Sequence, residues 1–152
     1  LDRVERPRLL DEATSAGEYL LAASLVLFGE PAPGERAPRD ADVIFESFDD
    51  LTYDRWTVTG DAFTDRPTRA GADRLAGEGT ARGEGFANTH RRLDGEGSAD
   101  ADRRVGTLTS EPFVIEHDYL HLLIGGGRHP GKTGLRVLVD GETVRSNQIF
   151  LF

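Results

Sequence analysis

Apolar residues recur at two different periods along the chain, and the period changes between residues 28 and 43. Over residues 8–28 the spacing is mostly three or four, at Leu9, Leu10, Ala13, Ala16, Leu20, Ala23 and Leu27. This spacing places apolar side chains along one stripe of a helix. Pro7 precedes the stripe, and Gly29 and Pro31 follow it, as at helix ends. The pattern predicts an N-terminal helix within residues 1–28, which docks on the next domain or belonged to a preceding one.

Residues 29–42 read GEPAPGERAPRDAD, with proline, glycine and charge but no period. This composition predicts a linker. We therefore expect a domain boundary here and a second domain over residues 43–152.

Beyond residue 43 the period is two, in short runs separated by long polar loops. The predicted strands are 43–48, 55–60 (with Trp56 and Val58 on one face), 85–90, 105–110, 112–117, 119–126 and 135–145, and the last is broken by Asp140-Gly141. An Asp-Gly pair between alternating segments is typical of a two-residue hairpin turn. Many short strands without a helical pattern predict an all-β fold, an antiparallel β-sandwich of jelly-roll or galactose-binding-like type.

Charge and length exclude several classes of protein. The 152 residues carry a formal net charge of −9, which argues against nucleic acid or an anionic membrane as the main partner. The apolar run at 19–28 is far shorter than the roughly 20 residues of a spanning helix. Acidic residues precede it, where a signal peptide carries positive charge. We expect neither membrane insertion nor a visible secretion signal.

The sequence lacks both cysteine and methionine. Without cysteine, the chain forms no disulfide, zinc–thiolate site or thiol nucleophile. Leu1 is not an initiator methionine, so we expect a processed product or a piece of a longer chain.

Residues 126–133, GGRHPGKT, match the phosphate-loop pattern G-x-x-x-x-G-K-[ST]. A phosphate loop works by leading into a helix whose amino end faces the phosphates. After Thr133 the period is two instead, and Pro130 lacks an amide donor. We favour a bend between strands made by Gly125, Gly126, Gly127, Pro130 and Gly131, and keep nucleotide binding through Lys132 as a remote alternative.

These same residues carry a family resemblance. The order FESFDDLTYDRWTVTGDAF, GFANTH and GTLTSEPFVIEHDYLHLLIGGGRHPGKTGLRVLVDGETVR looks like an accessory β-sandwich module. That module accompanies some family 32 glycoside hydrolases, which are levanase-like, and occurs in multidomain planctomycete proteins with cytochrome-like regions. The resemblance covers roughly residues 43–145. It implies an accessory, non-catalytic role and a secreted or cell-envelope location.

The chain departs from this module at its end. Closing strands of the module do not follow residue 145, so we expect a truncated sandwich or one completed by another chain. The opening WMNDPNG of the family 32 catalytic domain is also absent, so the resemblance implies no hydrolase activity.

Two constellations suit a metal ion. Glu46 and Asp49, with Asp50 and Asp54 nearby, offer the hard oxygen ligands that calcium prefers; a solvated acidic turn is the alternative that we favour. His117 and His121 are four apart, but on a strand they read as surface histidines. We expect no other cofactor.

No motif supports catalysis. A glycosidase needs two carboxylates at a fixed separation, and nothing singles out a pair among the 27 acidic residues. No serine lies in a G-x-S-x-G elbow.

Candidate sugar contacts are Trp56, Asn88, His90, Arg128 and His129, together with Tyr53. Aromatic rings and planar hydrogen-bonding groups suit such contacts, although Trp56 fits a core position equally well. We therefore predict a non-enzymatic accessory module that binds polysaccharide. The alternative is a structural or assembly domain that a neighbouring domain or partner chain completes.

Overall fold

The computed structural model describes most of the chain outside its termini and longer connections. The described residues are 4–11, 20–28, 43–72, 83–95, 97–114, 116–117, 119–126 and 132–148. Within them the chain forms eleven strands and one short helix. These are β1 (Val4–Asp11), β2 (Leu20–Phe28), β3 (Val43–Glu46), β4 (Trp56–Gly60), β5 (Thr68–Arg69), β6 (Gly85–Asn88), α1 (Ser98–Ala101), β7 (Gly106–Ser110), β8 (Phe113–Val114), β9 (Tyr119–Gly126), β10 (Thr133–Val139) and β11 (Glu142–Gln148).

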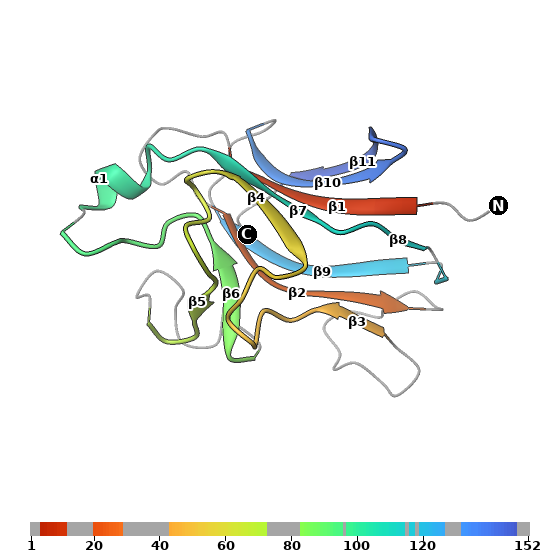
Figure 1. Cartoon of the computed structure of the whole chain (residues 1–152), viewed down its shortest axis with the longest axis horizontal. Coiled ribbons are helices and arrows are strands. Elements are labelled where there is room, and N and C mark those ends of the chain that lie inside the picture. The colour runs from red at the N-terminus through yellow and green to blue at the C-terminus, as the bar shows by residue number, and fades with distance from the viewer. Residues whose placement is uncertain are drawn as a thin grey trace.

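The strands form two antiparallel sheets (Figure 1). The first has the order β11-β10-β1-β7-β4, and β8 also pairs with β1. The second has the order β3-β2-β6-β5, and β9 pairs with β2 along almost its whole length. All pairings are antiparallel. The prediction of an all-β antiparallel fold is therefore confirmed.

The predicted N-terminal helix is wrong. Residues 4–11 and 20–28 are strands β1 and β2, and they lie inside the two sheets. The β2 run LLAASLVLF is apolar at nearly every position, so its residues fit a helical spacing as well as the strand period of two. The predicted linker, residues 29–42, lies outside the described residues.

Pro7 shows how a proline fits an inner strand. On one side of β1, Pro7 is opposite Val137 of β10. On the other side, β8 pairs with Val4 and Glu5, and β7 pairs only from Arg8 onward. On this side none of the described strands pairs with Pro7, so no ladder bond there requires its missing amide hydrogen.

The predicted hairpin at Asp140-Gly141 is confirmed. Val139 is opposite Glu142, and both turn residues have positive φ, 52° at Asp140 and 84° at Gly141. Positive φ at both central positions is the geometry that Asp-Gly favours.

The same segment contradicts the nucleotide alternative. Thr133–Val139 is a strand in the middle of a sheet ladder, so no helix begins there to hold phosphates. Gly125 and Gly126 are the last residues of β9, and residues 127–131, which include Pro130 and Gly131, lie outside the described residues.

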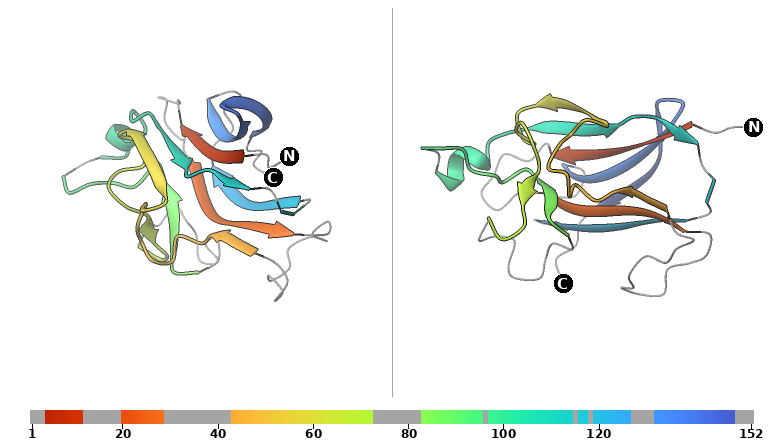
Figure 2. Two further views of the ribbon diagram at one scale, coloured as in Figure 1. Left: turned by 45° about the vertical axis from the view of Figure 1, so that its right-hand side comes forward. Right: turned by 60° about the horizontal axis from the view of Figure 1, so that its bottom comes forward.

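The hydrophobic core takes side chains from strands of both sheets. Its buried members are Phe45, Phe48, Tyr53, Trp56, Ala62, Phe63, Ala87, Leu108 and Leu135. Trp56 lies at the centre of an aromatic group, with ring centroids 5.6 Å from Phe48 and 6.2 Å from Phe45. Figure 2 shows the two groups of strands alongside one another. In the described part of the chain, no helix is long and apolar enough to cross a membrane.

Candidate binding site

Four of the predicted sugar contacts are buried. Tyr53 is 8% exposed, Trp56 7%, Asn88 1% and His90 5%. The Trp56 indole Nε1 donates to Glu46 Oε2 at 2.6 Å, so this ring packs in the core and presents no stacking platform. Arg128 and His129 lie outside the described residues.

Glu46 and Asp49, the acidic residues proposed for calcium, accept hydrogen bonds from the protein's own donors. Glu46 Oε1 accepts hydrogen bonds from the amides of Ser47 and Phe48 at 2.8 and 2.7 Å. Asp49 Oδ1 accepts from the Glu84 amide at 2.6 Å. Glu46 thus accepts from its own turn, and Asp49 joins this turn to the residue before β6. Over the residues that the structure describes, no group of three or more acidic or histidine side chains could hold a metal ion. His121 lies in β9, and His117 precedes it.

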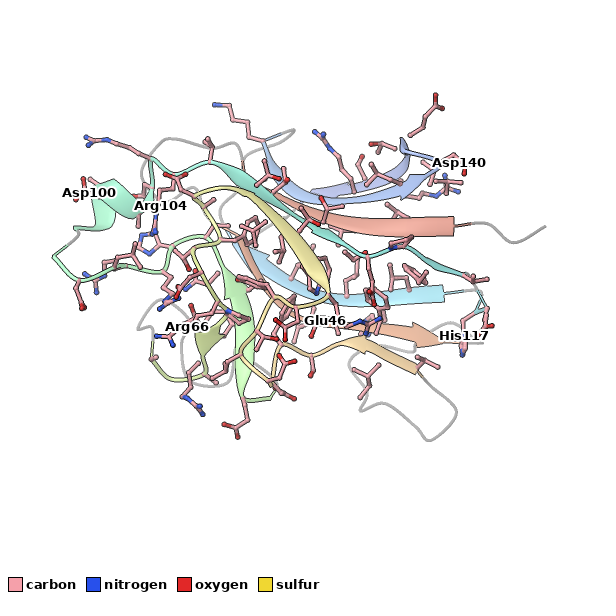
Figure 3. All side chains as sticks on the ribbon, viewed as in Figure 1. Glu46, Arg66, Asp100, Arg104, His117 and Asp140 are labelled. Carbon is pink, nitrogen blue, oxygen red and sulfur yellow. The ribbon has the colours of Figure 1, made fainter. Side chains whose placement is uncertain are left out.

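A pocket of about 660 Å³ opens where β5 meets the loops on either side of it. We call it the arginine pocket. Its lining residues are Asp50, Leu51, Arg66, Pro67, Thr68, Arg69, Ala72, Arg91 and Arg92. The pairing of Thr68 with Phe86 and of Arg69 with Gly85 brings the loop before β5 next to the segment after β6. Figure 3 places Arg66 beside β5.

Arg91 is the most firmly held of the four arginines. Its Nη1 donates to Asp65 Oδ1 at 2.7 Å, to Thr64 Oγ1 at 3.2 Å and to the Arg66 carbonyl at 3.2 Å. Slight burial of Asp65 acts to raise its pKa, but the hydrogen bond and charge of Arg91 outweigh it and hold the pKa below its usual value. Arg91 thus ties the loop before β5 to the segment after β6.

The other arginines are exposed at the rim. Arg69 forms an ion pair with Glu84, at 3.3 Å between Nη1 and Oε2. Arg66 lies 4.0 Å from Asp65. In the part of the chain that is described, the Arg92 side chain has no hydrogen-bond or ion-pair partner.

A buried polar layer of His90, Asp102 and Arg104 adjoins the segment that carries Arg91 and Arg92. His90 Nε2 is 3.4 Å from Asp102 Oδ1, and both side chains are 6% exposed. The Arg104 guanidinium, also buried, donates to the carbonyl of Arg91. Figure 3 shows Arg104 close to α1. The layer therefore fixes the main chain that carries Arg91 and Arg92.

A second set of contacts joins the pocket floor to this layer. Asn88 Nδ2 donates to Thr68 Oγ1 at 3.3 Å, and Asn88 Oδ1 accepts from the His90 amide at 2.8 Å. Asn88 and His90, predicted as ligand contacts, thus support the pocket.

The arginine pocket offers hydrogen-bond donors and a few apolar surfaces. Leu51, Pro67 and Ala72 supply the apolar surfaces. Among the lining residues that the structure describes, Asp50 is the single carboxylate. The chemistry suits binding of a polar or anionic ligand.

Sequence reasoning missed this pocket because its arginines come from separate loops. Arg66 and Arg69 are more than twenty residues from Arg91 and Arg92, and no local motif connects them. The sequence features that could have indicated it are the arginine-rich clusters RPTR at 66–69 and HRR at 90–92, which lie in or beside predicted polar loops.

Comparison with known proteins gives one similarity. The chain is 32% identical over 114 residues to a protein of Aspergillus rugulosus named "Putative glycosyl hydrolase ecdE". The aligned region covers 72% of this chain and 15% of that protein, so the chain spans a small part of its length. No family model matches the chain. No solved structure matches it.

Proposed function

We propose that this chain is a non-catalytic accessory module of a larger carbohydrate-active protein and that it binds carbohydrate. The observation that carries this proposal is the similarity to one small part of a protein named as a glycosyl hydrolase. A match confined to 15% of a long relative is what a module shared between larger proteins would produce. A secreted or cell-envelope location belongs to the same proposal.

The finer fold assignment is part of this proposal. We propose that the two sheets form a jelly-roll, galactose-binding-like sandwich of the kind that accompanies family 32 glycoside hydrolases. A core cluster that takes Phe45 and Ala87 from one sheet and Trp56, Leu108 and Leu135 from the other supports it. Such modules hold ligands in pockets between loops, which is where the arginine pocket lies.

The absence of a carboxylate pair in the described lining supports binding without cleavage. With Asp50 as the one acidic residue of that described lining, these residues do not supply the acid together with the nucleophile or base that the reaction requires. A sugar unit held there would be oriented by hydrogen bonds and left unchanged.

A pull-down with insoluble and immobilised polysaccharides tests this function. The full 152-residue chain is incubated with fructan, pectin and cellulose, and bound protein and released reducing sugar are both measured. We expect retention on at least one polysaccharide without release of sugar. Release of sugar, or no retention on any polysaccharide, would contradict the proposal.

A structural role is the second candidate, and the edge of the first sheet favours it. Among the described strands, β11 pairs only with β10, and residues 142–146 are exposed. Such an edge can accept another strand. However, Glu142 and Arg145 place charges on it, which natural sheets use to prevent pairing. A concentration-dependent oligomer in sedimentation, without glycan binding, would favour this second candidate.

A further inference from the structure

We propose that the arginine pocket binds an oxyanion carried by a saccharide, either a uronate carboxylate or a sulfate ester. The module would thereby select acidic glycans over neutral ones. This inference rests on the proposed carbohydrate-binding function and names its ligand class.

The pocket is lined mainly by positive charge, although the whole chain is net negative. The sequence has 27 acidic and 18 basic residues, yet the described residues of the pocket lining include four arginines and one aspartate. A planar guanidinium offers paired donors whose spacing matches the two oxygens of a carboxylate or sulfate. A pocket with several such groups therefore favours an oxyanion over a hydroxyl.

The carboxylates near the pocket leave room for a ligand. Asp65 and Glu84 pair with Arg91 and Arg69, but both are 72% exposed and neither lines the pocket. The Arg69–Glu84 pair is exposed at both side chains, so water screens it and it contributes little. The Arg91–Asp65 pair instead holds the less exposed Arg91 side chain in place. Arg92 has no partner in the described part of the chain, so its guanidinium is available to an oxyanion.

The site is also built before a ligand arrives. Three hydrogen bonds hold the Arg91 side chain, and Arg104 holds its carbonyl. A preformed set of donors loses less conformational entropy on binding than a flexible one. Leu51, Pro67 and Ala72 add apolar surface against which the C–H face of a sugar ring can pack.

Calorimetric titration of the full chain with three oligosaccharides of equal length tests the inference. The probes are an oligogalacturonide, a sulfated oligosaccharide and a neutral fructan oligosaccharide, at low ionic strength. We expect the better of the two anionic probes to bind at least about tenfold more tightly than the neutral one. We also expect its affinity to fall as salt is added. Whichever anionic probe binds more tightly identifies the oxyanion, and either result supports the inference.

Matched variants distinguish binding in the arginine pocket from a general effect of positive charge on the chain. Arg92→Gln and Arg66→Gln should each weaken anionic binding by about tenfold and leave the unfolding midpoint unchanged. Arg145→Gln removes the same charge from β11, outside the pocket, and should leave binding unchanged. Equal loss in Arg145→Gln, or equal binding of neutral and anionic probes, would overturn the inference.

The outcomes also distinguish this inference from the proposed function. Binding of the neutral probe without any gain for the anionic probes overturns the ligand class alone. Absence of binding to all three probes and to the polysaccharides of the pull-down overturns both.

Discussion

Glu46 connects the end of β3 to the core through three donors. Its carboxylate accepts from two backbone amides and from the buried Trp56 indole. Removing it leaves these donors without their partner, and an unpaired buried donor costs more than the hydrogen bond contributes. We expect Glu46→Ala to lower the free energy of unfolding by about 2 kcal/mol, as measured by chemical denaturation.

Glu111 provides the control for Glu46. It pairs with Arg55 at 2.6 Å, but both side chains are about half exposed. Glu111→Ala should therefore change the free energy of unfolding by no more than about 1 kcal/mol. If the two substitutions cost the same, the stabilising role of Glu46 is contradicted.

Tyr53 makes stability depend on alkaline pH. Burial raises the pKa of its hydroxyl above the ordinary value of 10.0. The folded chain then keeps this proton at a pH where the unfolded chain releases it, so stability is full below about pH 10 and falls above it. The slope from this group is at most about 1.4 kcal/mol per pH unit.

Tyr53→Phe measures this contribution. We expect the free energy of unfolding of the variant to fall less steeply than that of the wild type between pH 9 and pH 11. Other groups titrate alike in both chains, so the difference reports Tyr53. An identical alkaline decline would show that the hydroxyl titrates normally in the folded state.

At the scale of elements, the turn between β10 and β11 depends on a left-handed residue. Gly141 has φ +84°, where an added Cβ costs about 1 kcal/mol. Gly125, at the end of β9, does not have a positive φ, and nothing lies within 4 Å of an added Cβ. We expect Gly141→Ala to lower the free energy of unfolding by about 1 kcal/mol and Gly125→Ala to leave it unchanged or raise it. A larger loss from Gly125→Ala would contradict the assigned turn.

The elements also show which sequence patterns were informative. Trp56 and Val58 alternate towards the core as predicted, and both are shielded. The Asp140-Gly141 turn was predictable because its φ requirement belongs to two adjacent residues. For β1 and β2 the pattern failed because neither segment alternates cleanly: β1 mixes charged and apolar residues, and β2 is apolar at nearly every position, which fits a helical spacing equally well.

At the scale of the whole molecule, β1 and β2 each hold one of the two sheets together. β1 lies between β10 and β7, and β2 lies between β9 and the strands β3 and β6. Removing them would separate β10–β11 from β7–β4 and leave β9 without its partner. We expect a chain of residues 43–152 alone to show no cooperative unfolding transition in circular dichroism. A cooperative transition like that of the full chain would restore the predicted boundary at 29–42.

The arginine pocket is likewise a property of the whole molecule. The sequence shows arginines in two loops, but only the β5–β6 pairing and the contacts of Arg91 bring those loops together. The predicted contacts at Trp56, Asn88 and His90 had suitable chemistry, yet their depth depends on packing between distant segments. No short stretch of sequence indicates how deeply such a residue is buried, whereas two adjacent residues are enough to indicate a turn.

The most direct test of the account is to map glycan contacts by NMR. An acidic oligosaccharide is titrated into the isotope-labelled chain, and the amide shifts and the intact sugar are followed together. The account predicts shifts concentrated at Thr68, Arg69, Arg91 and Arg92, around the lining of the arginine pocket, with the sugar uncleaved. Shifts confined to another face, or cleavage of the sugar, would contradict a non-catalytic saccharide site at this pocket.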